Sequence, residues 1–412
     1  MAGNNFSWRA GRRAGLFTAL ALALFFTGCA TTPAPRIPLD AIPAAQQSRA
    51  RDNLRVYAAV WSHVTDQFYD AGLHGVDWPA AGRKFGALAA TAPDDRALYA
   101  LLNVMLSLLE DRHTYAFSPD LAEAKRTQQS ALTGISLIRI EGRWVVEEVM
   151  PGSPAEEAGV QPGWLIVTRN GRPMDERVDF RPAGGEIVRW EFLDPQDRIV
   201  PAALTARPVS LRSRPVVRTL PGGFAYLRFD SFNASNRRWL GAQLTARRDA
   251  PGVVIDLRRN RGGGSFSLAT TVGEFFGRSV ADGTFVTRGG FRLDVSSWQP
   301  GSAHYAGKVV VLVDSPTGSA AEIFSAVLQE HGRAKVVGRT SAGAVIGSDY
   351  YALPGGGELE LGRYDYFTPN GRRLEGRGVV PDVTIPRTLA DLRLARDADL
   401  EAALRVLGVP PE

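Results

Sequence analysis

Hydrophobic and polar positions divide the chain into regions of different periodicity. Between residues 49 and 112, apolar residues recur every three or four positions in two runs, over residues 54–68 and 98–109. This spacing places the apolar side chains on one face of a helix. An acidic pair, Asp94 and Asp95, precedes the second run and suits an N-cap. The pattern predicts a helical N-terminal domain over residues 49–128.

The following 80 or so residues have strand-like periodicity instead. Short runs rich in β-branched and aromatic residues cover residues 135–140, 144–149 and 165–168. Turn signals separate these runs, including Glu141-Gly142 and Asn170-Gly171. We therefore expect a small β-rich domain over residues 129–208.

Strands and helices alternate in the next region, which we place at residues 209–390. Apolar strands are expected at 225–229, 253–257, 309–313 and 336–337, and helices at 236–247, 266–277 and 320–330. Such alternation is typical of an α/β core with mostly parallel strands. A C-terminal helix is expected within residues 391–412. The fold class is thus α/β multidomain.

The N-terminus has the pattern of a targeting segment. Three arginines precede an apolar run at residues 14–26 that is too short to span a bilayer comfortably, which indicates a signal peptide over residues 1–28. Cys29 follows Gly28 and resembles the acylated cysteine of a bacterial lipobox; a plain secretory signal is the alternative. Residues 29–48, rich in Pro and Ala, are expected to be a linker. Ala30 favours outer-membrane sorting, so we expect a lipid-anchored protein of the cell envelope that faces the periplasm.

Composition and charge exclude several classes of function. The 412 residues are 44% apolar and 22% charged, as in ordinary globular proteins. The net charge of +5 includes three arginines of the signal peptide, and the remaining basic residues form no stripe, which argues against nucleic-acid binding. Cys29 is the only cysteine, so disulfides, a cysteine nucleophile and thiolate metal sites are excluded once it is acylated. We expect no metal or nucleotide cofactor.

Two turns after buried strands are candidates for chemistry. Ser319 lies in Gly318-Ser319-Ala320, between an apolar strand and a helix, where N–H groups and the helix dipole can stabilise an anion. The alternative is a simple N-cap serine. Gly262, Gly263 and Gly264 follow the strand at 253–257, and their backbone can approach a ligand closely. The alternative is a flexible turn.

Two further residues are candidates for acid–base work. His113 lies in Asp111-Arg112-His113-Thr114, directly after the second helical run, although a lone histidine is usually structural. Glu375 lies among glycines before Gly378-Val379-Val380-Pro381-Asp382, where it could orient a histidine or belong to a surface hairpin.

These motifs, in this chain order, resemble peptidase family S41, the C-terminal-processing and tricorn-type serine peptidases. The resemblance runs from about residue 55 to residue 382. It rests on the motifs at 111–114, 152–163, 256–264, 318–323, 368–372 and 378–382. It implies a helical N-terminal region, an inserted PDZ-like domain and a crotonase-like ββα protease core.

One departure from the family pattern decides which mechanism the resemblance implies. Many members use a Ser/Lys dyad with the lysine 25 residues beyond the serine, a position held here by Ala344. The tricorn-type branch uses Ser/His/Glu, which implies Ser319 as nucleophile, His113 as base and Glu375 as its orienting carboxylate. The implied oxyanion donors are the N–H groups of Ala320 and of Gly262 or Gly263.

The resemblance therefore implies a serine endopeptidase that acts on envelope polypeptides. The substrate C-terminus is expected to bind a groove at Thr133, Gly134, Ile135 and Ser136 by strand addition. The expected partners are a protein or peptide substrate and the membrane, through the N-terminal lipid. Two alternatives remain, a non-catalytic PDZ adaptor and an esterase that uses the same triad.

Overall fold

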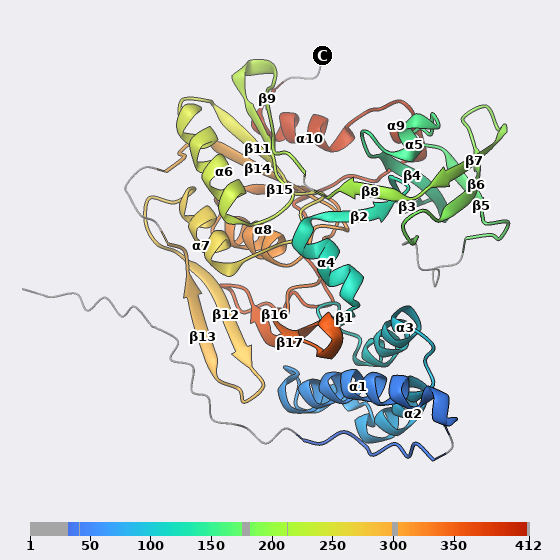
Figure 1. Cartoon of the computed structure of the whole chain (residues 1–412). Coiled ribbons are helices and arrows are strands. Elements are labelled where there is room, and N and C mark those ends of the chain that lie inside the picture. Colours follow the sequence, from blue (N-terminus) through green and yellow to red (C-terminus); the bar gives the residue numbers. More distant parts are fainter. Residues whose placement is uncertain (1–31, 41, 175–181, 212, 299–303, 410–412) are drawn as a thin grey trace, which may run out of the picture.

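The chain forms a helical base, an α/β core and a protruding β-rich module (Figure 1). The computed structural model describes residues 32–40, 42–174, 182–211, 213–298 and 304–409. The predicted signal peptide and Cys29 lie outside the described residues. Among the described helices, none combines the length and the apolar character that crossing a bilayer requires.

Three helices form the base: α1 (Gln47–Gln67), α2 (Trp78–Ala90) and α3 (Asp95–Leu106). Their apolar faces meet in one buried cluster that includes Trp61, Trp78 and Leu102. The Asp94 side chain accepts a hydrogen bond from the Ala97 N–H at 2.8 Å, so the predicted cap of α3 is confirmed.

The segment expected to be a linker is packed on this base instead. Thr32 donates from its N–H and its hydroxyl to Asp66, at 2.9 and 2.5 Å, and Ile42 is buried against α1 and α2. Ile37 and Leu39 join the same small apolar cluster. The prediction of a linker over residues 29–48 is therefore wrong for residues 32–40 and 42–48, because isoleucine and leucine interrupt the Pro/Ala-rich run and pack on an apolar surface, and α1 begins at Gln47.

The β-rich module is an antiparallel sheet in the order β3-β4-β5-β6-β7. Its strands are β3 (Ile135–Ile140), β4 (Arg143–Val149), β5 (Leu165–Arg169), β6 (Ile187–Leu193) and β7 (Ile199–Thr205), with the short helix α5 (Pro154–Glu157) after β4. The ribbon of β2 (Gln129–Leu132) and β8 (Arg207–Ser210) joins this module to the rest of the chain. Because β3 pairs with β4 alone, one backbone edge of β3 is unpaired within this sheet.

The α/β core is built on a six-stranded sheet in the order β18-β15-β14-β11-β10-β9, in which every neighbouring pair is parallel except β10 with β9. The strands are β9 (Val216–Thr219), β10 (Ala225–Arg228), β11 (Gly252–Asp256), β14 (Lys308–Val313), β15 (Lys335–Gly338) and β18 (Val383–Thr384). The predicted parallel α/β core is confirmed, and its strands lie within a residue or two of their expected positions.

Helices cover both faces of this sheet. On one face, α6 (Ala234–Ala246), α7 (Ser265–Gly273) and α8 (Ala320–Glu330) enclose the largest apolar cluster. On the other face lies α10 (Ala398–Leu407), and a short helix, α9 (Leu389–Arg393), packs against the β-rich module through Leu389. The predicted C-terminal helix is thus part of the core, since its apolar face covers the second side of the sheet.

A second sheet was not predicted from the sequence. It has the order β1-β17-β12-β13, and β16 pairs with β17 as well. Its strands are β1 (Tyr115–Phe117), β12 (Ala281–Thr287), β13 (Arg292–Ser296), β16 (Gly347–Ala352) and β17 (Glu358–Phe367). Leu359 and Leu361 of β17 join the apolar cluster of the helical base, so this sheet connects the base to the core. The remaining helix, α4 (Pro119–Thr127), lies between β1 and β2.

Candidate active site

Ser319 lies at the sharp turn between β14 and α8. Its φ and ψ angles are 53° and −125°, a region that non-glycine residues rarely adopt. The residue is half-buried, and its N–H donates to the Ala344 carbonyl at 2.7 Å and to Glu322 Oε2 at 3.0 Å. The strained turn and both of these contacts hold the backbone of Ser319 at the N-terminus of α8.

Glu322 holds the loops around Ser319 together. Its carboxylate is completely buried and accepts four hydrogen bonds, all from the loops next to the serine. The donors are the N–H groups of Ser319, Gly343 (2.7 Å) and Ala344 (2.9 Å) and the hydroxyl of Ser341 (2.6 Å). We did not predict this role, although the Ser-x-x-Glu spacing of a capping box is a sequence signal for the contact between Glu322 and Ser319.

The glycine loop lies directly against the serine. A Cβ atom added at Gly262 would lie 2.5 Å from Ser319 Cβ and 2.9 Å from the Ala320 nitrogen, so only glycine fits. The Gly262 N–H donates to Oδ1 of the buried Asn260 at 2.9 Å. Within the described part of the chain, no acceptor is bound to the N–H groups of Gly263 and Ala320. These two donors are available to a ligand, whereas that of Gly262 is already bonded.

A buried network of ion pairs holds the ends of β11 and β14, the strands that lead into the glycine loop and into the Ser319 turn. Asp256 ends β11 and pairs with Arg258 at 2.7 Å, and Asp314 follows β14 and pairs with Arg339 at 2.7 Å. Asp399 of α10 contacts both arginines. Burial alone would raise the pKa of Asp256, but the Arg258 guanidinium holds it below its usual value. The two loops are therefore anchored to one charged cluster.

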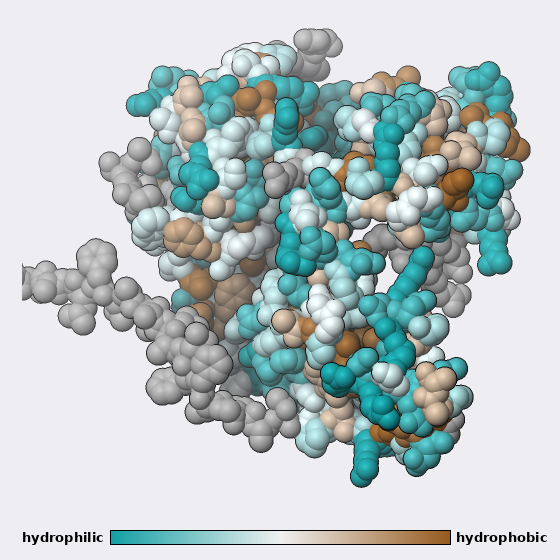
Figure 2. All heavy atoms as spheres, in the orientation of Figure 1, coloured by the Kyte–Doolittle hydropathy of each residue, from teal (hydrophilic) through white to brown (hydrophobic). Residues whose placement is uncertain are grey.

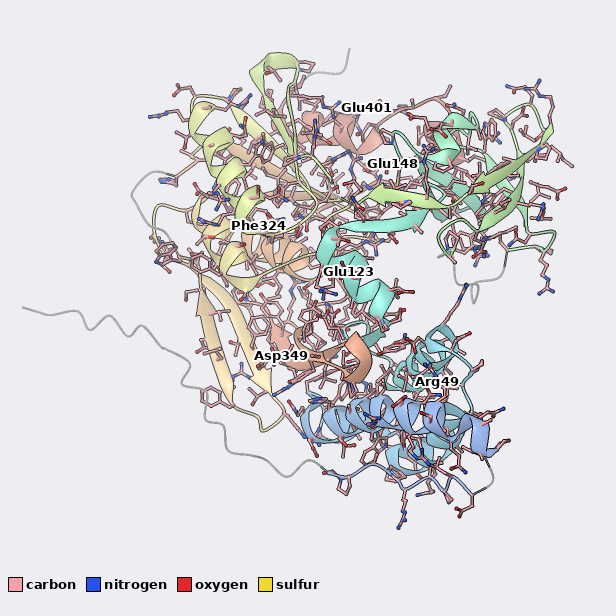
Figure 3. The ribbon with its side chains drawn as sticks, in the orientation of Figure 1. Arg49, Glu123, Glu148, Phe324, Asp349 and Glu401 are labelled. Atoms are coloured by element: carbon pink, nitrogen blue, oxygen red, sulfur yellow. The ribbon has the colours of Figure 1, made fainter. Side chains whose placement is uncertain are left out.

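Two further ion pairs connect this region to the β-rich module. Arg259, in the loop before Gly262, pairs with Glu148, and Arg387 pairs with Glu147 at 2.8 Å and with Asp314. Figure 3 shows Glu148 on the side of the module that faces the α/β core. The module is thus in direct contact with the glycine loop.

His113 lies in the loop between α3 and β1, where Asp111 fixes the backbone. Asp111 accepts the His113 N–H at 3.0 Å and the Thr114 hydroxyl at 2.5 Å, and Thr114 in turn accepts the Gly362 N–H from β17 at 3.0 Å. The Nδ1 atom of His113 is buried and has no hydrogen-bond partner among the described residues. The Nδ1 atom of the imidazole is therefore available for a hydrogen bond.

Glu375 is half-buried next to the same histidine. Its Oε2 accepts the N–H groups of Val345 at 2.7 Å and Ile346 at 3.2 Å. The pKa of Glu375 is raised above its ordinary value, mainly because burial disfavours the charged carboxylate. The charge of Asp111 raises this pKa further. The hydrogen bond from Val345 and the charge of His113 act in the opposite direction and lower the pKa. His113 and Glu375 thus interact electrostatically without a direct hydrogen bond.

The segment 344–346 connects two of the three predicted residues, Ser319 and Glu375. Ser319 binds its first residue, Ala344, and Glu375 binds the next two. No hydrogen bond links the side chains of Ser319, His113 and Glu375 in the ranges that the structure describes. In ligand-free sites such bonds are often long and tighten only in the complex. Arg112, next to His113, is exposed and donates to the Ala342 carbonyl at 2.9 Å, at the edge of this segment.

The predicted peptide groove lies at the start of β3, away from the serine. The carbonyls of Thr133 and Gly134 are bonded to the N–H groups of Ala155 (2.9 Å) and Met150 (2.8 Å), and Gly134 has a φ of 89°. Ile135 and Ser136 are the first two residues of β3, the strand with an unpaired edge in this sheet. Strand addition at this edge requires no rearrangement of the sheet.

The described ranges contain no group of three or more His, Cys, Asp or Glu side chains arranged to hold a metal ion. Cys29 is outside these ranges, so its predicted acylation stays a prediction.

Two family models match this architecture. The model of peptidase family S41 matches residues 223–385, which include both loops and Glu375, and the tricorn protease C1 domain matches residues 50–107. Residues 223–385 are thus a peptidase family S41 domain. The members of this family are serine-type peptidases, whose substrates are proteins or peptides.

Individual relatives of this S41 peptidase are distant but similar over most of its length. It is 26% identical to the carboxyl-terminal-processing protease of Picosynechococcus, over 84% of this chain and 87% of that one. It is 27% identical to two Streptomyces coelicolor chains named as tricorn protease homologues, of which it spans only about a third (32% and 34%). The photosystem II D1 C-terminal processing protease has a similar fold, with a TM-score of 0.58 at 23% identity, over 87% of this chain and 98% of that one.

Proposed function

We propose that this S41 peptidase is a serine endopeptidase that cleaves envelope polypeptides with a Ser319/His113/Glu375 triad. Ser319 attacks the peptide carbonyl, and His113 takes the hydroxyl proton and later delivers it to the leaving amine. Glu375 orients the imidazole and stabilises its cation. As the family resemblance implies, the β-rich module is proposed to be a PDZ-like domain and the α/β core a crotonase-like ββα core.

The observation that carries the proposal is the shared support of Ser319 and Glu375. Both bind the backbone of the segment 344–346, and the charge of His113 acts on the pKa of Glu375. These contacts support the assignment of the three residues to one site.

The oxyanion donors are the N–H groups of Ala320 and Gly263. This choice follows from the bond that already joins the Gly262 N–H to Asn260. Gly262 has a different role, because its missing side chain allows the loop to approach Ser319. Removal of one such donor typically lowers the rate about 10²–10³-fold.

A fluorophosphonate probe tests the triad. Intact mass after labelling should show one adduct on the wild-type protein, none on Ser319→Ala and much slower labelling of His113→Ala and Glu375→Gln. Ser315→Ala, an exposed serine of the same loop, is the matched control and should label normally. A folded wild-type protein that does not react would contradict the proposal.

A second candidate function, that of a non-catalytic adaptor, is favoured by one observation. The buried Nδ1 of His113 has no partner, as expected of a site that no longer assembles. The same labelling experiment separates the two functions, since an adaptor does not react with the probe. Peptidase and esterase activity on the triad are then separated by the hydrolysis of matched peptide and ester substrates.

Capture of a substrate C-terminus by the PDZ-like module is supported by the free edge of β3. Peptides with a free C-terminal carboxylate should bind more tightly than their C-terminal amides, as measured by fluorescence anisotropy. Equal affinity of the two forms would count against capture at Thr133–Ser136.

Attachment to the envelope rests on Cys29. Labelled palmitate should be incorporated into the wild-type protein in cells and not into Cys29→Ser. Fractionation should then place the wild-type protein with the outer membrane, as Ala30 predicts for a Gram-negative host. A soluble, unlabelled wild-type protein would contradict acylation and would favour the alternative, a plain secretory signal.

A further inference from the structure

Two large aromatic side chains lie exposed next to the glycine loop. Phe266 is 61% exposed and Trp298 is 51% exposed, and their ring centroids are 5.7 Å apart at an interplanar angle of 37°. Single exposed apolar residues are normal on a protein surface, and Figure 2 shows hydrophobic residues scattered over the visible face. An adjacent pair of exposed aromatic rings at a candidate active site is different, because the two rings offer a continuous apolar surface.

The position of Phe266 in the chain limits how far this side chain can lie from the peptide bond that is cleaved. Phe266 lies in the first turn of α7, four residues beyond Gly262, which packs directly against Ser319. Four residues span at most about 14 Å even when extended. A peptide bound across Ser319 advances about 3.3 Å per residue, so side chains within a few positions of the cleaved bond can reach Phe266.

Contacts with α7 and α6 hold the aromatic pair in place. The Trp298 N–H donates to the carbonyl of Ala269 on α7 at 3.1 Å. The Arg237 guanidinium of α6 lies 5.7 Å from the centroid of the Phe266 ring, in a cation–π contact. Aromatic side chains that are fixed before binding lose little conformational entropy when a ligand arrives.

We propose that Phe266 and Trp298 form a subsite that binds a large apolar side chain of the substrate, close to the cleaved peptide bond. This inference rests on the proposed function and adds to it a preference that depends on the substrate sequence. Its occupant is an aliphatic or aromatic side chain, because the two rings offer apolar surface and stacking partners.

The test is a cleavage-site profile. Peptides from a digest of denatured protein are incubated with the enzyme, and the new termini are read by mass spectrometry for the wild type, Phe266→Ala and Trp298→Ala. We expect the wild type to favour Leu, Phe or Met over Ala at one position near the cleaved bond. Either substitution should reduce that preference about tenfold or more, a size typical of apolar pockets.

The control is Phe291→Ala. Phe291 is an equally exposed phenylalanine, 67% accessible, in the turn between β12 and β13. Its substitution should leave the preference unchanged. Phe266→Leu, which keeps an apolar side chain, should retain most of the preference and shows that the loss in Phe266→Ala is not caused by misfolding.

Labelling with the fluorophosphonate probe distinguishes failure of this inference from failure of the proposed function. All four variants should still form the adduct, because none removes a group that reacts with the probe. If the wild type labels but its profile does not change in Phe266→Ala and Trp298→Ala, or all cleavage falls equally, the subsite is overturned and the triad stands. If the wild type does not label, the proposed function itself fails.

Discussion

The backbone N–H of Ser319 donates to the carbonyl oxygen of Ala344 at 2.7 Å. Ala344 is the position at which dyad-type members of the family are expected to carry their lysine, and it is 8% exposed. The contact places residue 344 beside the nucleophile, so a lysine there would be next to Ser319. Its replacement by alanine in this chain leaves His113 as the candidate base.

A lysine restored at position 344 should therefore replace the histidine in part. In the His113→Ala background, Ala344→Lys should raise the rate of fluorophosphonate labelling about tenfold or more at pH 9, since a positioned general base contributes about 10²–10⁴. The gain should vanish at pH 6, where the lysine is protonated. Ala344→Met, which has a similar length and no base, is the control. Equal labelling of the Lys and Met variants would contradict the prediction.

Elements with a strong local pattern were predicted well from the sequence. The helix at 320–330 and the strand at 135–140 have the predicted bounds, because uninterrupted apolar periodicity and flanking turn residues define them locally. The sheet of β1, β12, β13, β16 and β17 was missed, although burial alternates over the first four residues of β17. Most of its strands are half-exposed, and what stabilises them is pairing with segments far away in the chain.

The candidate site shows the same contrast between features with a local sequence signal and features that depend on distant contacts. Ser319, His113 and Glu375 could be named because each lies in a motif. The shared support of Ser319 and Glu375 on the segment 344–346, however, is a tertiary contact with no local signal. The choice of Gly263 over Gly262 as oxyanion donor also required the structure, since it depends on the bond from Gly262 to Asn260.

The pH at which kcat/KM falls on the acid side of its profile should depend on Asp111. The negative charge of Asp111 raises the pKa of Glu375, so Asp111→Asn removes one reason for that shift and the pKa of Glu375 should fall. Because the ionised carboxylate is the active form, the acid limb of kcat/KM should move to lower pH. The asparagine Oδ1 can still accept the His113 N–H.

A pH profile of peptide hydrolysis measures this displacement. Glu110→Gln, at the exposed neighbouring residue, should leave the acid limb unchanged. An acid limb that moves to higher pH in Asp111→Asn would show that the sign of the argument is wrong.

Glu322→Gln should destabilise the protein and slow the serine. Both oxygens of this buried carboxylate accept two hydrogen bonds each, so an amide NH₂ at either position faces two donors. Unpaired buried donors cost about 1–3 kcal/mol each, and we expect a loss of roughly 2–4 kcal/mol in the free energy of unfolding. Urea denaturation measures it, and the labelling rate should fall as well because the Ser319 turn loses its support.

The matched control is Glu123→Gln on α4. Glu123 (Figure 3) is an exposed helical glutamate whose side chain pairs with exposed Arg126, and such exposed pairs contribute little. A Glu322→Gln protein as stable as this control would mean that the loops do not depend on the carboxylate.

Asp282 should make the stability of the fold fall as pH rises from mildly acidic to neutral. It lies in β12, is 2% exposed, and neither carboxylate oxygen has a hydrogen-bond partner. Burial raises the pKa of Asp282 to about 7 from an ordinary value of 3.8. Between these two pH values the folded protein holds a proton that the unfolded chain has released, so the stabilisation present at low pH is lost progressively up to about pH 7.

Asp282→Asn removes this titration while it conserves the shape of the side chain. Between pH 5 and pH 8 the wild type should lose about 2–3 kcal/mol more unfolding free energy than the variant, which follows from about 1.4 kcal/mol per pKa unit. Urea unfolding at the two pH values, compared with exposed Asp249→Asn, isolates the contribution of this one group. If Asp282→Asn and Asp249→Asn follow the same pH dependence as the wild type, Asp282 is ionised in the folded protein across this range. The carboxylate would then need a cation or water partner in solution, because a bare buried charge costs more than the fold can supply.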